Sequence, residues 1–333
     1  MNSPMESQLG ADLHLLVAAQ PFTPDLELIE RRAKKRHRRN TMLKAGGGAG
    51  VVAAVAAAAV AIASGPQSTA PTVARASTPA SPLMTLAADI TAAPAVSGDS
   101  TVLITHKTIG GRSMDTVYEL FTDGGAHYPG DSKATLRSAV VQGANDGGTM
   151  YTAVTKAAVY ASSGNLTSAR TMMVNATSNC WGLGLSAAAQ QALWTKCTSS
   201  SAIQQKLKAN GVKSLPRPTG AKLRNDIDNA IWTNSSAALL AGASRPQVRA
   251  GVLRLLSTIP DVTVTKTTTN GQATLTIAGG AALFGGAPET LVVNATTGLP
   301  VKEIEAASGK VPAAAQTFTV ERTTLSAVKA GKF

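Results

Sequence analysis

The sequence predicts an α+β protein in which helices pack against one antiparallel sheet, outside the membrane and after a single N-terminal transmembrane helix. Two observations predict this class. A block of positive charge at 31–44 directly precedes an uncharged segment at 45–63. Beyond residue 99, segments with strand periodicity come first and last, and helical segments lie between them. Strands grouped before and after a run of helices are typical of one sheet covered by helices.

The basic block sets the expected orientation. It has no acid and contains the cations Arg31, Arg32, Lys34, Lys35, Arg36, Arg38, Arg39 and Lys44. The nineteen residues at 45–63 would reach about 28 Å as a helix, close to the ~30 Å hydrocarbon core. Because basic residues stay on the cytoplasmic side, we expect a single-pass membrane protein with its N-terminus in the cytoplasm. The expected parts are a cytoplasmic tail, a signal-anchor helix, a linker rich in Pro, Ala, Ser and Thr, and an extracytoplasmic domain: 1–44, 45–63, 64–98 and 99–333.

The uncharged segment leaves alternatives open. It consists of ten Ala, four Gly, four Val and one Ile, so its hydrophobicity is marginal for an anchor. A cleaved export signal that ends at Ala61-Ile62-Ala63 has the same parts, and it also places the rest of the chain outside the cytoplasm. A buried Ala-rich helix of a soluble protein is a third interpretation, against which the eight adjacent cations argue.

The chain has a net positive charge, with 31 Lys and Arg against 19 Asp and Glu. In 99–333 the basic residues are scattered and are not clustered with aromatic residues, so they do not form the basic stripe of a nucleic-acid binder. They suit a domain near an anionic membrane surface or wall polymer. Membrane lipid is therefore an expected partner, and nucleic acid is not.

The two cysteines, Cys180 and Cys197, lie 17 positions apart on the expected outer side. In an oxidising compartment a disulfide is the default interpretation. On the chain-entropy account such a loop contributes about 3 kcal/mol. A metal site would need further ligands, and no Cys, His or acid lies between the two cysteines.

Several elements are expected before the outer domain. Residues 8–19 have the spacing of a short amphipathic helix. A second helix is expected from Pro24 into the crossing, because Thr23 is a good N-cap and Pro suits the first helical position. Within the linker, 83–90 has the pattern of a first short helix of the domain.

In the outer domain, strands are expected at 101–109, 117–121 and 150–160, with a turn at Asp123-Gly124-Gly125. Residues 166–175 are ambiguous. Helices are expected at 186–209, 222–241 and 245–259. Later strands are expected at the following ranges: 262–267, 273–277, 290–293, 300–305 and 316–322.

The segments 249–277 (RAGVLRLLSTIPDVTVTKTTTNGQATLTI) and 289–305 (ETLVVNATTGLPVKEIE) resemble the C-terminal half of an actinobacterial family of uncharacterised single-span membrane proteins. The N-terminal tail is similar to the same family. More distantly, the outer domain resembles the half-open barrels of periplasmic lipoprotein carriers and sigma-factor regulators. The resemblance implies a curved sheet closed by helices around an apolar hollow. One departure is VYELFTDGG before the Asp-Gly turn, where the family has a Trp-rich strand.

No catalytic, cofactor or metal site is expected from the motifs. His106 and His127 follow no nucleophile motif, and we interpret both as ordinary surface histidines. The acid pairs at 226 and 228 and at 303 and 305 are interpreted as solvated. The chain has no Walker loop, no H-E-x-x-H and no dinucleotide fingerprint.

The sequence therefore favours a non-enzymatic, membrane-anchored extracytoplasmic binding or sensor protein. The expected ligand is apolar or amphiphilic, or the partner is a component of the cell envelope. The alternative is a transmembrane regulator whose cytoplasmic helices bind a sigma factor or another transcription regulator, because 8–39 offers an apolar face.

Overall fold

The computed structural model describes residues 81–333 apart from 93, 95, 147, 178, 210–214, 285 and 310. The expected cytoplasmic tail with its basic block, the signal-anchor helix and most of the linker lie outside the described residues. Among the helices that the structure describes, none combines the length and the apolar character that a membrane crossing needs.

Eight strands form one sheet in the order β3-β2-β1-β8-β7-β6-β5-β4, and every pair of neighbours is antiparallel. The sheet confirms the predicted α+β class and the order of strands, helices and strands. The first and the last strand of the chain pair with each other in the sheet. The strands are β1 Ser100–Ile109, β2 Arg112–Thr122, β3 His127–Gly130, β4 Val262–Thr269, β5 Gln272–Gly279, β6 Glu289–Asn294, β7 Pro300–Glu305 and β8 Ala314–Thr323.

The helices fall between β3 and β4, apart from α3 at the start of the domain, α11 between β5 and β6, and α12 at the end. Their bounds are α3 Pro82–Thr91, α4 Lys133–Val141, α5 Gly148–Ser162, α6 Leu166–Val174, α7 Ala187–Thr198, α8 Ser201–Ala209, α9 Gly220–Ala241, α10 Pro246–Leu256, α11 Ala281–Phe284 and α12 Leu325–Lys329.

Helix α5 corrects the strand predicted at 150–160. The apolar residues of this segment lie at spacings of three, four and seven, and all four are fully buried: Val154, Ala157, Ala158 and Ala161. This spacing places them on one helical face, which a strand cannot do. The ambiguous segment 166–175 is also helical, and the helix predicted at 186–209 is divided into α7 and α8 around residues 199 and 200.

Helix α3 confirms the short helix predicted at 83–90. Its residues Leu83, Leu86, Ala87 and Ile90 are buried in the main core, where they pack with α10. Residues 82–91 of the expected linker range 64–98 are therefore part of the folded domain. The domain begins with α3, because this helix supplies core residues.

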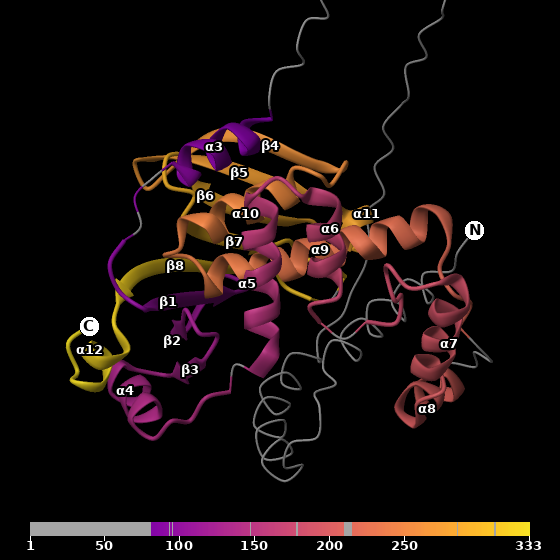
Figure 1. The fold of residues 1–333 in the computed structure, drawn as a ribbon, viewed down its shortest axis with the longest axis horizontal. Helices are drawn as coiled ribbons and strands as arrows, with labels where there is room; N and C mark the ends of the chain where they lie inside the picture. The colour runs from indigo at the N-terminus through magenta and orange to yellow at the C-terminus, as the bar shows by residue number, and fades with distance from the viewer. Residues whose placement is uncertain are drawn as a thin grey trace, which may run out of the picture.

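The two faces of the sheet have different covers (Figure 1). We call the face that carries Leu291 and Glu303 the inner face, and the one that carries Val102 and Val292 the outer face. The main core joins Leu275, Ile277, Leu291 and Val293 of the inner face to α3, α5, α6, α9 and α10. On the outer face, α4 and α12 cover only the end formed by β1, β2 and β3.

Close contacts between backbones hold the helical layer together. Helix α10 crosses α5 at Gly251, where a Cβ atom would overlap the carbonyl oxygen of Ala158. The buried Arg249 of α10 donates to the carbonyl oxygens of Thr297 at 2.7 Å and Ala243 at 2.5 Å. It thereby ties α10 to the β6–β7 turn and to the α9–α10 loop.

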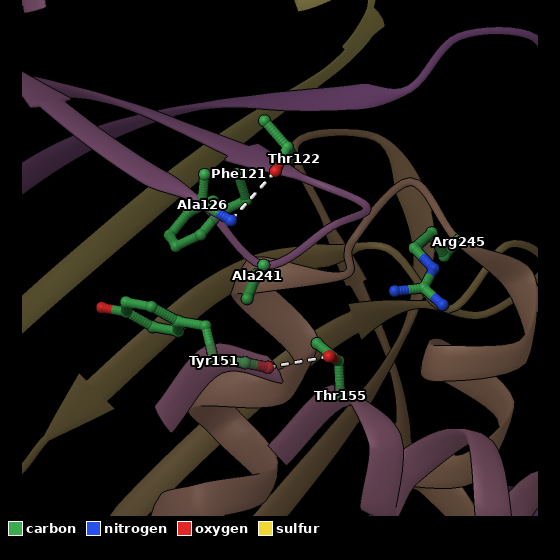
Figure 2. A pocket seen from close by; sticks show the side chains of 8 residues that line it. Phe121, Thr122, Ala126, Tyr151, Thr155, Ala241 and Arg245 are labelled. Atoms are coloured by element: carbon green, nitrogen blue, oxygen red, sulfur yellow. Dashed lines mark hydrogen bonds between the residues drawn. The ribbon is translucent and has the colours of Figure 1, made fainter. Parts of the chain in front are cut away.

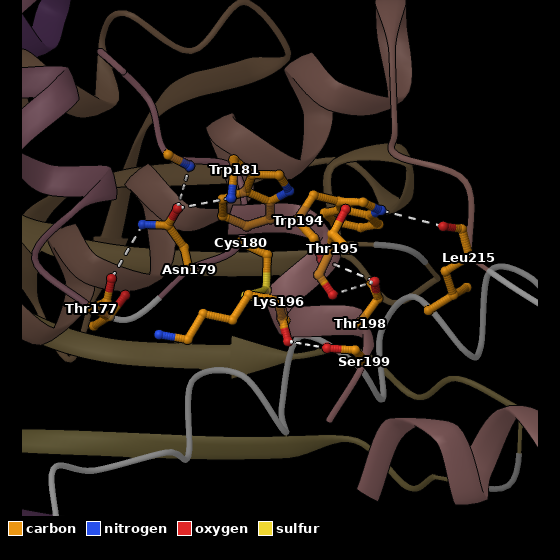
Figure 3. The surroundings of a disulfide bond; sticks show 12 residues. Thr177, Asn179, Cys180, Trp181, Trp194, Thr195, Lys196, Thr198, Ser199 and Leu215 are labelled. Carbon is orange, nitrogen blue, oxygen red and sulfur yellow. Dashed lines mark hydrogen bonds between the residues drawn. A yellow bond between two sulfur atoms is a disulfide. The ribbon is translucent and has the colours of Figure 1, made fainter. Parts of the chain in front are cut away.

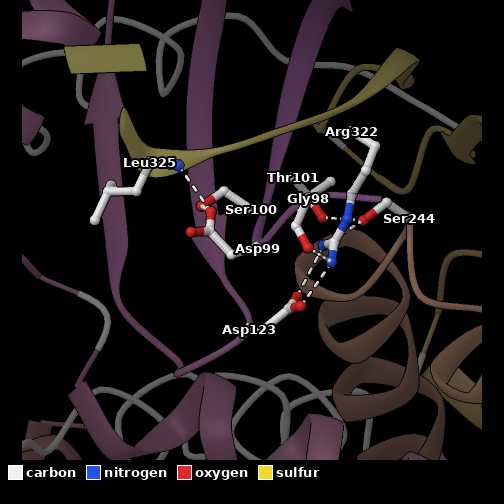
Figure 4. Close-up of polar contacts among 8 residues, drawn as sticks. All are labelled: Gly98, Asp99, Ser100, Thr101, Asp123, Ser244, Arg322 and Leu325. Carbon is white, nitrogen blue, oxygen red and sulfur yellow. Dashed lines mark hydrogen bonds and ion pairs between the residues drawn. The ribbon is translucent and has the colours of Figure 1, made fainter. Parts of the chain in front are cut away.

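Arg322 of β8 connects four segments next to the same α9–α10 loop (Figure 4). Its guanidinium makes two bonds with Asp123 of the β2–β3 turn, at 2.6 and 2.8 Å. It also donates to the carbonyl oxygen of Gly98 at 2.7 Å and to Ser244 Oγ at 3.1 Å. The hydrogen bonds with Asp123 raise the pKa of Arg322.

The crossing at Gly251 gives a first prediction. Gly251→Ala should lower the free energy of unfolding by about 3 kcal/mol, because α10 must move away from the backbone of α5. Gly280→Ala is the matched control, since a Cβ atom there meets nothing within 4 Å. Urea denaturation measures both variants. Equal stability of the two variants would contradict the close crossing.

Candidate functional site

Three carboxyl groups gather on the inner face at one end of the β6–β7 hairpin. Glu289 of β6 lies directly opposite Glu305 of β7, and Glu303 lies between Leu291 of β6 and Gln316 of β8. Residues directly opposite in an antiparallel pair project from the same face. We call Glu289, Glu303 and Glu305 the carboxyl cluster. It corrects the interpretation of Glu303 and Glu305 as a solvated pair for Glu303 alone, because Glu303 is half-buried, whereas Glu305 is exposed.

Helix α9 places buried polar side chains above this part of the sheet. Trp232 and Ser235 are fully buried, and Ser236 is 9% exposed. Trp232 Nε1, Ser235 Oγ and Ser236 Oγ have no hydrogen-bond partner among the described residues. The indole of Trp232 packs edge-on against Phe284 of α11, with ring centroids 5.2 Å apart. Buried donors without partners cost about 1–3 kcal/mol each.

Burial and mutual repulsion shift the titration of the cluster. Burial raises the pKa of Glu289 to about 7, and the charges of Glu303 and Glu305 add to the rise. Burial likewise raises the pKa of Glu303 to about 7, with a further contribution from Glu305. Trp232 opposes the rise at Glu289, and Lys107 and Ser236 oppose it at Glu303, yet Trp232 Nε1 and Ser236 Oγ make no hydrogen bond of normal geometry.

The cluster can therefore take up a proton near neutral pH. Neutralisation removes the cost of burying negative charge beneath α9. A metal ion is a poorer fit, since the described residues place no three His, Cys, Asp or Glu side chains where they could hold one. Because Glu305 is exposed, the cluster reaches the surface at its outer end.

His127 belongs to a second polar network and is not a surface residue. It is 6% exposed, which corrects the prediction, whereas His106 is exposed and bonds Thr116 Oγ1 at 2.8 Å, as expected of a surface histidine. The Nδ1 atom of His127 lies 2.5 Å from Asp146 Oδ1, and its Nε2 atom lies 3.0 Å from Glu119 Oε1. The imidazole stacks on Phe121, with centroids 4.6 Å apart.

Burial alone would lower the pKa of His127, but the carboxylates of Asp146 and Glu119 outweigh it and raise the pKa to about 9. At neutral pH the ring is therefore an imidazolium, and both of its nitrogen atoms donate. A group in this state cannot act as a general base, which must accept a proton. The network instead joins β2 and β3 to the segment before α5.

The aspartates of α9 diverge as their spacing predicts, but they are not both solvated. Asp228 is buried and forms an ion pair of 2.6 Å with Arg170 of α6. Asp226 lies 3.8 Å from Lys222 on the same helix. Burial raises the pKa of Asp226, and Lys222 opposes the rise. Asp228 thus joins α9 to α6, whereas Asp226 pairs within α9, and the two aspartates do not form a carboxylate pair.

Cys180 and Cys197 form a disulfide, which is the pairing expected from the sequence, with their Cα atoms 5.9 Å apart (Figure 3). It joins the loop after α6 to α7. The buried Trp194 of α7 donates from Nε1 to the carbonyl oxygen of Leu215 at 3.3 Å. The disulfide therefore anchors the α7–α8 unit, which lies beside the sheet and not over it (Figure 1).

Comparison of the chain with family models, with curated proteins and with solved structures gives no match. The family resemblance described above remains a prediction. The functional argument therefore depends on the geometry of the described residues.

Sequence reasoning missed Glu289, Trp232 and Ser236. A signal was present for Glu289. In ETLVV this acid lies on the same strand face as Leu291 and Val293, which are buried. For Trp232 and Ser236 no signal was available, since a tryptophan and a serine on a helix are ordinary core and surface residues.

The cluster predicts how stability depends on pH. The folded-state pKa of about 7 exceeds the ordinary value of 4.5, so stability is greatest below pH 4.5 and falls as the pH rises through about 7. Glu303→Gln removes one of these titrations and should make the domain about 1–3 kcal/mol more stable than the wild type at pH 8, and no more stable at pH 4.5. Urea denaturation across this range measures the difference.

Glu321→Gln is the control for this experiment, because Glu321 lies opposite Val102 on the outer face. The control should follow the wild-type profile. An unchanged profile in Glu303→Gln would show that burial beneath α9 does not govern the titration of this carboxyl group.

His127 predicts a fall of stability at higher pH. Its folded-state pKa of about 9 lies above the ordinary 6.5, so its contribution is complete below pH 6.5 and is lost as the pH rises through about 9. In His127→Gln the unfolding free energy should be about 1–3 kcal/mol lower than in the wild type at pH 6, with a smaller gap at pH 10. His106→Gln is the control. A gap that stays constant with pH would contradict the ion-paired imidazolium.

Proposed function

We propose that the chain is a non-enzymatic, membrane-anchored extracytoplasmic binding and sensor protein. The location is supported by the basic block that precedes the uncharged segment 45–63. It is also supported by the disulfide between Cys180 and Cys197, since such bonds persist in oxidising compartments outside the cytoplasm.

The carboxyl cluster beneath α9 is the observation that carries the binding function. Acceptors on the sheet and donors on α9 face the same region, and within the described part of the chain three of the buried donors have no hydrogen-bond partner. A cationic group of a guest would neutralise Glu289 and Glu303, and a hydroxyl group of the same guest would accept hydrogen bonds from Trp232 and Ser236. An amphiphile with such a head group, or an envelope component that presents one, satisfies both requirements.

The head group, and not an apolar interior, is the part of the guest that this geometry favours. A pocket of about 10 Å³ is formed elsewhere, between Phe121 and Arg245 (Figure 2), and it is far smaller than the roughly 300–1,000 Å³ of sites for drug-sized ligands. It does not supply the apolar hollow that the family resemblance implies. The guest would approach the cluster from the exposed side of Glu305.

The absence of catalysis is part of the proposal and is supported by the chemistry of His127. This imidazolium is held by two carboxylates, and no Ser or Cys side chain bonds to it among the described residues. The carboxyl cluster can hold a proton but faces no activated nucleophile in this part of the chain. Binding of a guest to the cluster would change the packing of α9.

Native mass spectrometry of the full chain, extracted from membranes at pH 7.5, tests the proposal. The wild type should retain a small amphiphile, and the double variant Glu303→Gln with Ser236→Ala should lose it, because the variant lacks one acceptor and one donor. Glu321→Gln should retain it. A wild-type chain that carries no small molecule, or equal retention of the amphiphile by all three proteins, would contradict the binding function. Recovery of the chain from the soluble cytoplasmic fraction would contradict the anchor.

A further inference from the structure

The positive charge of the domain is concentrated in one part of it. Residues 147–225 contain nine Lys and Arg and no Asp or Glu, whereas the rest of 81–333 has 13 Lys and Arg against 14 Asp and Glu. The cations are widely spaced along the chain, so the imbalance comes from the missing acids and not from a basic run. Seven of the nine cations lie in 187–225, which begins with α7 and ends in the first turns of α9.

Contacts hold α7, α8 and residues 215–225 together, and we call this part of the chain the basic unit. Leu215 connects its pieces. The carbonyl oxygen of Leu215 accepts a hydrogen bond from Trp194 of α7, and its side chain packs against Ile203 and Leu207 of α8. The disulfide joins α7 to the loop after α6. The segment that leads into α9 is therefore fixed against both helices.

The two helices of the basic unit bury apolar side chains and expose cations. In α8, Ile203 and Leu207 are buried, whereas Lys208 is exposed. In α7, Lys196 is exposed, and Figure 3 shows its side chain extending away from the buried Trp194. The charge of the unit therefore lies on its surface.

Most of this charge has no counterion within the domain. Lys222 lies 3.8 Å from Asp226, but Lys196, Lys208 and Arg224 form no ion pair in the part of the chain that the structure describes. One exposed cation without a partner is ordinary. Several of them on a unit that has no acid give a positive potential, which attracts anionic surfaces within about 8–10 Å at physiological salt.

The position of the basic unit leaves it free to meet a surface. Helices α7 and α8 lie beside the sheet, at the opposite end of the molecule from α12 (Figure 1). Eighteen residues, 64–81, separate the expected crossing at 45–63 from the start of α3. Even fully extended, they would span at most about 65 Å. An anchored chain therefore keeps this unit close to the membrane surface.

We propose that the basic unit binds the anionic lipid head groups of the membrane to which the chain is anchored, an inference that rests on the proposed function for the anchor. A plane of lipid phosphates matches cations that are spread over two helices and a helix start. A bilayer also suits Leu185, which is 50% exposed directly before α7, because an apolar side chain can enter the boundary between head groups and acyl chains.

Co-sedimentation with lipid vesicles tests this on the full chain, carried in nanodiscs of uncharged lipid. The wild type should sediment with vesicles that contain phosphatidylglycerol and not with phosphatidylcholine alone, and high salt should release it. The double variant Lys196→Gln with Lys208→Gln should bind about tenfold more weakly or worse, because each cation near an anionic surface contributes roughly a factor of five.

The double variant Lys329→Gln with Lys332→Gln is the charge-matched control. Both lysines are exposed, at or just after the end of α12 and so far from the basic unit, and this variant should bind as the wild type does (Figure 1). Equal weakening in the two variants would show that only net charge matters and would overturn the proposal.

Two further outcomes would overturn it. One is a wild type that binds phosphatidylglycerol vesicles no better than uncharged ones, and the other is a wild type that binds soluble polyphosphate but not the vesicles, which would make the partner a polymer. The vesicle assay does not need the anchor. A chain that fails to remain in the nanodiscs contradicts the proposed location, and its own binding to vesicles still decides the role of the basic unit.

Discussion

The packing of α9 onto a sheet face that carries carboxyl groups is the constraint on which the rest of the domain depends. Glu289 and Glu303 lie beneath this helix, and burying their charge costs free energy. The cost is offset in part by the order of the strands. Lys107 of β1 and Glu303 of β7 both lie opposite Gln316 of β8, so a cation, an amide and a carboxyl group form one row across three strands. This row exists only because the first and last strands of the chain are paired.

On the side of α9 that faces α6, the polar side chains have hydrogen-bond partners. Asp228 bonds Arg170, and Asn234 donates to the carbonyl oxygen of Met173 at 2.7 Å, so α9 is joined twice to α6. The inner side differs, because Ser235 and Ser236 remain without partners there. The helix is thus held firmly by its neighbours and less completely by the sheet.

Much of the fold could be predicted from the sequence, because strand alternation and turn residues are local signals. The turn at Asn270-Gly271 and the β6–β7 hairpin both lie where their residues indicate. Helix α5 was missed because threonine, tyrosine and valine in 150–160 favour strands, whereas the buried alanines 157, 158 and 161 decide the matter through packing with α10. Buried acids were missed for another reason. Their environment depends on strands and a helix that are distant in sequence, although the hairpin register alone places Glu289 opposite Glu305.

Helix α9 is held along its length, and this fixes the surroundings of the carboxyl cluster. Asp228 and Asn234 join the helix to α6, and Ala241, its last residue, packs with Leu103 and Phe121 of the sheet. Trp232 and Ser236 lie between these contacts, close to Glu289 and Glu303. Because the helix is fixed on both sides of them, the carboxyl groups keep surroundings that disfavour their charge, and their raised pKa values follow from the fold.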